Sequence, residues 1–136
     1  MTVIAGGTCT PEGRAAVWRG AAESLLRRSR LVVVSAPDFP RGCPAEEVLA
    51  LADEVERAAA RLAGADLDLT QVELRTDEDF AGRLLSVAES ERAEMIVIGL
   101  RRRSPVGKLL LGSHAQRVLL EAGCPVLAVK GDELAS

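Results

Sequence analysis

The feature that most constrains this chain is the strict alternation of short apolar runs with segments of helical periodicity. Residues 3–5, 31–34 and 95–98 are uninterrupted apolar runs, which are typical of strands buried on both faces of a sheet. Residues 67–74 interleave polar side chains and favour an edge strand, and residues 126–129 form the last apolar run. Because a helical segment separates each strand from the next, the sequence predicts a doubly wound α/β fold with five parallel strands and four helices.

Local signals predict where the helices begin and end. A hydroxyl cap at Thr10 followed by Pro11 predicts the start of the first helix, and Gly64 predicts the end of the second. Thr76 and Asp79 have the spacing of a capping box, with Thr76 as the cap, before the third helix. Apolar residues recur at helical spacing and predict the buried faces. These residues are Ala15, Trp18, Ala22 and Leu25 in the first helix, Val48, Leu51, Ala52, Val55, Ala59 and Leu62 in the second, Phe80, Leu84, Val87 and Ala88 in the third, and Ala115, Val118, Leu119 and Ala122 in the fourth.

Length and composition narrow the class of protein. A chain of 136 residues is long enough for one domain with a substantial core, which we expect at residues 1–130, followed by a polar tail at residues 131–136. Hydrophobic residues make up 48% of the chain and aromatic residues only 2%, so the core is expected to be aliphatic. The net charge of −3 argues against binding to a nucleic-acid backbone, and the scarcity of aromatic residues argues against stacking on its bases. We therefore expect no nucleic-acid partner.

The sequence also carries signals about location. No stretch approaches the ~20 apolar residues of a membrane helix, and the first residues lack the charged start of a signal peptide, so no membrane association is expected. The cysteines, Cys9, Cys43 and Cys124, are odd in number and widely spaced, without a C-x-x-C pair. This spacing favours neither a disulfide framework nor a metal site. We predict a cytoplasmic protein with three reduced cysteines and Cys124 buried.

The strongest functional signal lies between the fourth predicted strand and the last predicted helix. Gly99 ends the strand, and Gly112 and Ser113 open the helix. Glycines at such positions let the backbone approach a ligand, and the free N–H groups at a helix start favour an anion. The loop between them carries three arginines at 101–103 and also Lys108. Two interpretations stay open for each feature: Ser113 either contacts phosphate or caps the helix, and the basic loop either binds phosphate or is a solvated surface.

Two stretches of sequence carry a resemblance to a known family. Residues 112–130, GSHAQRVLLEAGCPVLAVK, look like the closing helix and strand of the universal stress protein family, and residues 10–17, TPEGRAAV, look like the start of its first helix. Gly99, Gly112 and Ser113 fall on the family's phosphate motif, G-x2-G-x9-G-[S/T]. The resemblance implies the sheet order 3-2-1-4-5, with ATP held between the first and fourth strands, where the winding reverses.

Within this resemblance, two positions depart from the pattern of the nucleotide-binding members. Arg102 stands at the second glycine of the motif, where a Cβ narrows the pocket. Thr8 stands where these members carry an aspartate that serves the adenosine end of the ligand. Ile98 matches a backbone contact to the nucleotide, and Ala36 matches a position beside the adenine. The cofactor-binding set that the resemblance implies is Thr8, Ala36, Ile98, Gly99, Arg102, Gly112 and Ser113.

The sequence thus predicts a regulatory or ligand-sensing module with a modified and weak adenine-nucleotide pocket. No general base, activated nucleophile or metal set can be assembled from it, so we do not expect an enzyme. The first alternative is a dimeric protein-interaction module that does not bind nucleotide. The second is a thiol redox protein that uses Cys9, which lies near a helix N-terminus that would lower its pKa. The apolar run at 126–129 and the family resemblance predict a symmetric homodimer formed through the last strand.

Overall fold

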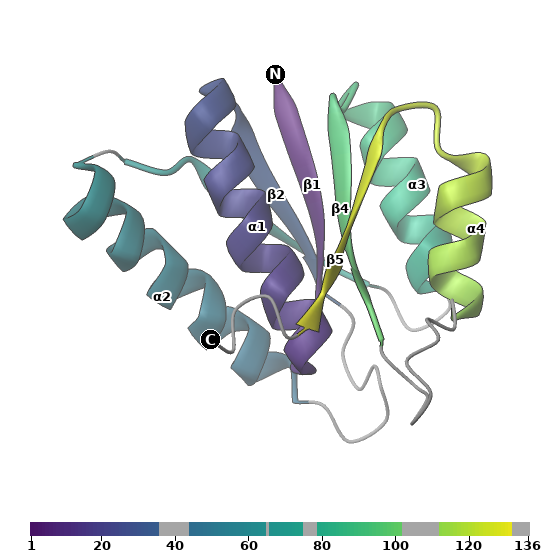
Figure 1. Ribbon diagram of the computed structural model, residues 1–136, viewed down its shortest axis with the longest axis horizontal. Helices are drawn as coiled ribbons and strands as arrows, with labels where there is room; N and C mark the ends of the chain where they lie inside the picture. The colour runs from purple at the N-terminus through teal and green to yellow at the C-terminus, as the bar shows by residue number, and fades with distance from the viewer. Residues whose placement is uncertain (36–43, 65, 75–78, 102–111, 132–136) are drawn as a thin grey trace.

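The computed structural model describes residues 1–35, 44–64, 66–74, 79–101 and 112–131. Within these ranges the chain alternates between strands and helices from its first residues to its last strand, as Figure 1 shows. The elements are β1 (Thr2–Gly7), α1 (Pro11–Arg27), β2 (Arg30–Ser35), α2 (Ala45–Ala63), β3 (Leu69–Glu73), α3 (Phe80–Ser90), β4 (Met95–Leu100), α4 (Ser113–Glu121) and β5 (Val126–Lys130).

The strands form one parallel sheet in the order β3-β2-β1-β4-β5, which confirms the expected fold class and order. β1 lies in the middle, where Ile4 pairs with Val32 of β2 on one side and with Ile96 of β4 on the other. The winding reverses between β1 and β4, because the chain first builds outward through β2 and β3 and then returns. Figure 1 shows α1 and α2 on one face of the sheet and α3 and α4 on the other. We call the edge where the strands begin the amino edge and the edge where they end the carboxyl edge.

Two apolar clusters fill the space between the sheet and its helices, one on each face. In β1, Val3 and Ala5 pack with residues of α1 and α2, whereas Ile4 packs with residues of α3 and α4, and all three are 0% exposed. Such alternation is required of a central strand that is covered on both faces. Phe80 is the only aromatic residue among the buried, described members of the two clusters, so the core is aliphatic as predicted.

The helix ends follow local sequence signals with one exception. Thr10 caps α1 by accepting a hydrogen bond from the amide of Gly13 at 3.1 Å, and Gly64 closes α2 with a φ of +61°. The expectation that Thr76 caps α3 is wrong. The N-cap is Asp79, whose Oδ1 accepts a hydrogen bond from the amide of Gly82 at 2.6 Å. An aspartate directly before a buried apolar face is itself a good cap, so the helix begins three residues later than predicted.

Three residues assigned to buried helical faces are exposed instead. Ala22 of α1 faces solvent, Leu62 at the end of α2 is 87% exposed, and Leu119 of α4 is 40% exposed. In α1 the buried face is rotated toward small residues such as Gly20, against which Ala5 and Leu31 pack closely. An Ala-rich helix has more than one apolar face, so spacing alone does not decide which one meets the sheet.

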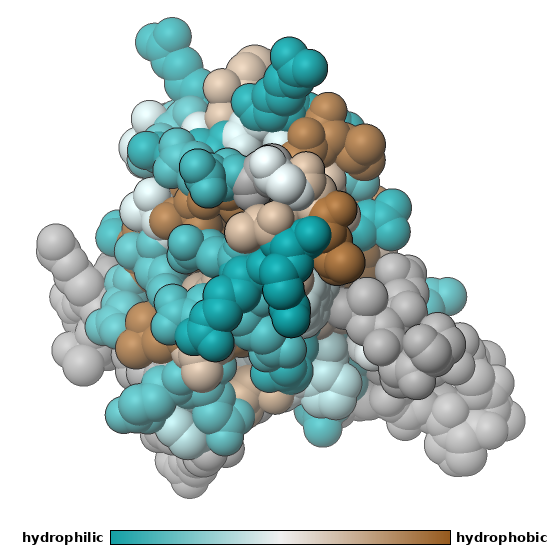
Figure 2. Space-filling view, turned by 90° about the vertical axis from the view of Figure 1, so that its left-hand side faces the viewer, coloured by the Kyte–Doolittle hydropathy of each residue, from teal (hydrophilic) through white to brown (hydrophobic). Residues whose placement is uncertain are grey.

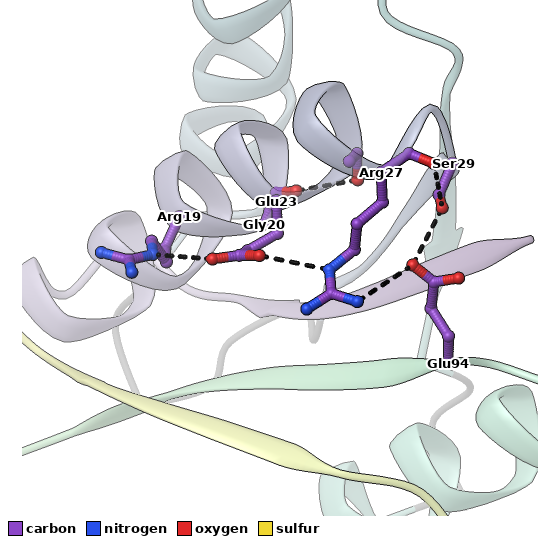
Figure 3. Close-up of polar contacts among 7 residues, drawn as sticks. Arg19, Gly20, Glu23, Arg27, Ser29 and Glu94 are labelled. Carbon is purple, nitrogen blue, oxygen red and sulfur yellow. Dashed lines mark hydrogen bonds and ion pairs between the residues drawn. The ribbon is translucent and has the colours of Figure 1, made fainter.

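A polar cluster ties α1 to the turns at the amino edge (Figure 3). The carboxylate of Glu23 accepts from Arg19 Nε at 3.3 Å and from Arg27 Nε at 3.2 Å. A second nitrogen of Arg27 lies 3.7 Å from Glu94, which also accepts from the hydroxyl of Ser29 at 3.0 Å. The side chains of Glu23 and Glu94 are each only 14% exposed. The cluster therefore joins the end of α1 to the residue that precedes β4.

The face over α2 is mainly hydrophilic, with hydrophobic residues in small, separate groups (Figure 2). The acidic and basic residues of α2, among them Glu54, Arg57 and Arg61, point away from the sheet. None of the described helices combines the length and the apolarity that crossing a bilayer requires.

Candidate functional site

The carboxyl edge brings together most of the residues that the sequence singled out. β1 and β4 are neighbours there, with Ala5 paired to Val97, so Thr8 and Gly99 both follow these pairs at the same edge. The first turn of α4 begins at this edge too (Figure 1). Ile98 is 5% exposed, and its side chain packs into the cluster under α3 and α4. Only its backbone is therefore left at the carboxyl edge. The predicted positions Ala36 and Arg102 lie outside the described residues.

Gly99 has a packing role that the sequence did not reveal. A Cβ on Gly99 would lie 2.1 Å from the carbonyl oxygen of Glu12 and 2.4 Å from its carbonyl carbon. Gly131, just past β5, approaches the same turn, because its Cβ would lie 2.9 Å from the amide nitrogen of Glu12. The first turn of α1 is therefore packed directly against the backbone at the ends of β4 and β5. Only glycine fits at Gly99, whether or not a ligand is bound.

Thr8 is part of the cap of α1. It is 6% exposed, and its hydroxyl lies 2.7 Å from the hydroxyl of Thr10. Thr10 in turn accepts from the amide of Gly13, where a Cβ would lie 1.8 Å from the Thr8 hydroxyl. The Thr8 side chain is therefore engaged in local structure, at the position where the resemblance places the aspartate of nucleotide-binding members.

The first turn of α4 is exposed at the carboxyl edge. Gly112 is the N-cap, without a side-chain cap bond, and Gly112 and Ser113 are both exposed. The carbonyl of Gly112 accepts from the amide of Gln116 at 3.0 Å, which places Ser113 inside the helix as its first residue. The interpretation of Ser113 as the helix cap is therefore wrong. The amides of this turn receive no side-chain cap, and the helix dipole adds positive potential there.

Contacts between the first turns of α3 and α4 hold this site in place. Arg117 donates to Asp79 at 2.7 Å and to Glu121 at 3.1 Å. The hydrogen bond from the Gly82 amide and the adjacent Arg117 guanidinium lower the pKa of Asp79 below its usual value. The ring of His114 meets the ring of Phe80 edge-on, with centroids 6.1 Å apart. The N-terminal part of α4 is thus held against α3 through Asp79, which also caps α3.

Two cations near the site lie outside the predicted cofactor-binding set, although Arg101 belongs to the basic loop that the sequence offered as a phosphate contact. Lys130 is the last residue of β5, is half-buried and pairs in register with Leu100 of β4. Arg101 follows Leu100 and is exposed. No ion pair is formed by either residue with the described part of the chain, unlike Arg117. The sequence places both residues at the ends of predicted strands. The pairing of β4 with β5 shows that these two strand ends are neighbours.

The oxidation state and burial of the cysteines differ from the prediction of three reduced thiols with Cys124 buried. Cys9 is disulfide-bonded, and that prediction is wrong for it. Cys43 lies outside the described residues. Cys124 is free and half-buried rather than buried, and desolvation raises the pKa of its thiol. A disulfide removes one support for a cytoplasmic location, because such bonds are rare in reducing compartments.

The fold is that of a doubly wound α/β protein whose winding reverses between β1 and β4, the place where ligands bind in folds of this class. The family model described as "Universal stress protein family" matches residues 7–130. A universal stress protein of Mycolicibacterium smegmatis is 40% identical over 128 residues, which cover 94% of this chain and 96% of the relative. The chain belongs to the universal stress protein family.

Solved structures agree with the fold. A universal stress protein solved in complex with cAMP superposes with a TM-score of 0.65 at 21% identity, covering 96% of this chain and 97% of the other. The universal stress protein from Archaeoglobus fulgidus in complex with dAMP superposes with a TM-score of 0.59 at 22% identity, covering 95% and 96% of the two chains. At these identities the likeness supports the shared architecture alone.

Proposed function

We propose that this chain is a regulatory module that binds an adenine nucleotide weakly at its carboxyl edge and does not turn it over. The observation that carries the proposal is the exposed first turn of α4, at the carboxyl edge beside β1 and β4. Two proteins of the same fold were solved with cAMP and with dAMP, which supports an adenine nucleotide as the ligand class. Arg101 and Lys130 add positive charge at the same edge.

The proposed weakness follows from the adenosine side of the pocket. A charged hydrogen bond from the ligand to an aspartate there would contribute about 1.5–3 kcal/mol, and the neutral Thr8 lacks that charge. The Thr8 hydroxyl also stays with Thr10, 2.7 Å away. Arg102 could offset the loss with a phosphate contact, but its Cβ occupies a position where the family has glycine. Binding should therefore be led by the phosphates and should weaken with added salt.

Calorimetry with ATP tests this proposal. We expect wild type to bind with a Kd on the order of 100 μM or weaker. Ser113→Asp should abolish binding, because it places a carboxylate where the phosphates would lie, while an acid in the first turn favours the helix. Ser113→Ala is the matched control and should reduce affinity only by about threefold, as one neutral hydrogen bond is lost.

Two further variants separate the roles of the departing residues. Arg102→Gly, alone and with Thr8→Asp, should tighten ATP binding, with the double variant tightest. Wild-type binding at low micromolar affinity that Arg102→Gly weakens would show that the arginine is a ligand, and the proposed weak pocket would then be wrong. Binding that Ser113→Asp leaves unchanged would remove α4 from the site altogether.

We also propose that the chain forms a homodimer through β5, and this is the basis of the alternative function as a protein-interaction module. Val126, Leu127 and Ala128 are half-exposed, and among the described strands β5 pairs only with β4. Ile96 donates to the carbonyl of Pro125 at 3.0 Å, and the alternation of a parallel ladder then directs the amides of Val126 and Ala128 away from β4. These amides can pair with a second copy.

Sedimentation at tens of micromolar protein (a range suited to moderate interfaces) tests the dimer. Wild type should sediment as a dimer, and Ala128→Pro should yield a folded monomer, because proline removes an outward amide and is tolerated at strand edges. Ala128→Ser keeps that amide and should remain a dimer. A monomeric wild type, or a dimer that survives Ala128→Pro with native circular dichroism, would contradict pairing through β5.

A further inference from the structure

A cavity lies at the amino edge, at the opposite end of the sheet from the proposed nucleotide site. It opens between the C-terminal ends of α3 and α4, which lie side by side on one face of the sheet (Figure 1). Its volume is about 430 Å³, which falls within the range of small-molecule sites. The lining residues are Leu85, Ala88, Glu89, Arg92, Ala93, Ile96, Glu121, Ala122, Gly123 and Cys124.

Part of the wall of this α3–α4 cavity is apolar. Ile96 of β4 is 0% exposed to solvent and forms part of the wall with Leu85 and Ala88 of α3. Small side chains, among them Ala88 and Ala122, line the cavity near the ends of the two helices. Desolvation raises the pKa of the Cys124 thiol, which agrees with a poorly hydrated wall. An aliphatic group of a ligand would lose water on entering this space.

The rim of the cavity carries an excess of negative charge. α1 and α2 have Arg27 and Arg61 in their last turns, but α3 and α4 have no basic residue there. They carry Glu89 and Glu121 instead, so two carboxylates and the negative ends of two helix dipoles meet at the opening.

The cations at the amino edge do not all neutralise this charge. Arg27 pairs with Glu23 and Glu94 (Figure 3), and Arg30 pairs with Glu91. Arg117 lies 3.1 Å from Glu121 and also binds Asp79. Glu89 has no ion pair with any described residue. Arg92, at the rim, is the one lining residue that bears a positive charge.

The backbone at Arg92 fixes that residue in an unusual conformation. Its φ is +49°, a left-handed value that costs a non-glycine residue about 1–2 kcal/mol. Its amide donates to the carbonyl of Glu89 at 3.2 Å, which sets the turn that closes α3. Arg28 ends α1 with a similar φ of +53°, so Arg92 lies in a helix-ending turn that places it at the mouth of the cavity.

We propose that the α3–α4 cavity binds a small organic cation, a protonated amine on a compact aliphatic body. The aliphatic body packs against Leu85, Ala88 and Ile96, and the ammonium group lies at the rim near Glu89 and Glu121. This site is separate from the proposed nucleotide site, so the two proposals can be tested independently.

Three probes of nearly equal size and different charge test the proposal: isopentylamine, isopentanol and isovalerate. Each is titrated into isotopically labelled protein, and amide signals are followed by NMR. We expect saturable shifts for isopentylamine at Ala88, Gly123 and Cys124, with a Kd on the order of millimolar. Isopentanol and isovalerate should bind more weakly by about fivefold or more, because they lack the positive charge.

Variants at the rim and wall sharpen the test. Glu89→Gln should weaken amine binding by about threefold, and Arg92→Gln should strengthen it, because one removes an attractive charge and the other a repulsive one. Glu56→Gln, an exposed substitution on α2, is the matched control and should change nothing. Ala122→Leu should abolish binding by filling the cavity. If the NMR spectrum shows that Ala122→Leu is misfolded, the two rim variants still test the proposal, because their expected changes in amine affinity have opposite signs.

Several results would overturn the proposal. Isovalerate binding as tightly as isopentylamine would show that charge does not select the ligand. Shifts confined to the carboxyl edge, or no saturation up to tens of millimolar amine, would show that the cavity is not the site. Unchanged affinity in a folded Ala122→Leu protein would do the same.

Discussion

Gly99→Ala is expected to destabilise the protein by about 3 kcal/mol, because the added methyl group overlaps backbone atoms, which cannot rotate away as a side chain can. The new Cβ would lie 2.1 Å from the carbonyl oxygen of Glu12, and the turn that holds this oxygen is capped by Thr10. Relief requires moving the whole first turn of α1 away from β4. Chemical denaturation followed by circular dichroism measures the loss.

Gly123→Ala is the control for this prediction. Gly123 is exposed, and a Cβ there meets nothing within 4 Å, so its stability should stay within about 0.5 kcal/mol of wild type. A stable Gly99→Ala protein would mean that α1 is not packed against β4 as described. A Gly99→Ala protein that loses nucleotide binding without losing stability would instead assign Gly99 to the ligand alone.

Val129→Asp should destabilise the protein by about 4 kcal/mol or more, because it buries a carboxylate in an aliphatic cluster without a partner. Val129 is 2% exposed and belongs to the cluster beneath α1 and α2. Although β5 is an edge strand, this side chain points into the core. The loss should appear as a shift of the unfolding midpoint at any protein concentration.

Thr70→Asp on the opposite edge strand is the matched control. Thr70 is an exposed residue of β3, so the same carboxylate should cost less than about 1 kcal/mol. If Val129→Asp lowers only the dimer population and leaves the monomer as stable as wild type, the burial of Val129 would be contradicted. The comparison also shows why a charge at Val129 is unsuitable for testing dimerisation.

Most of the fold was predictable because its signals are local. Uninterrupted apolar runs indicated the central strands, and Thr10, Pro11 and Gly64 marked helix ends through their own backbone chemistry. Errors arose where two local solutions compete. Asp79 caps α3 in place of Thr76, and Leu62 and Leu119 extend an apolar stripe into solvent. Such choices depend on the surface that each helix meets, which spacing does not contain.

The candidate site was predictable only in outline. The sequence indicated that Gly99, Gly112 and Ser113 share a neighbourhood, and the structure brings Gly99 and the first turn of α4 to one edge. It could not show that Gly99 packs on Glu12 or that Thr8 bonds to Thr10, because these contacts arise from the docking of α1 against the sheet. The α3–α4 cavity left no sequence signal, since it results from small residues on two separate helices.

The central place of β1 has a consequence for synthesis on the ribosome. β1 emerges first and can pair with β2 soon afterwards, but its other partner, β4, begins about 60 residues after β2 ends. At ordinary rates of translation this interval lasts about 3–12 s. Throughout it, the backbone groups of Thr2 and Ile4 that face β4 have no strand to bond, and an open apolar edge invites pairing with other chains. The nascent protein is therefore most exposed to aggregation before Met95 leaves the ribosome, and the arrival of β4 ends that period.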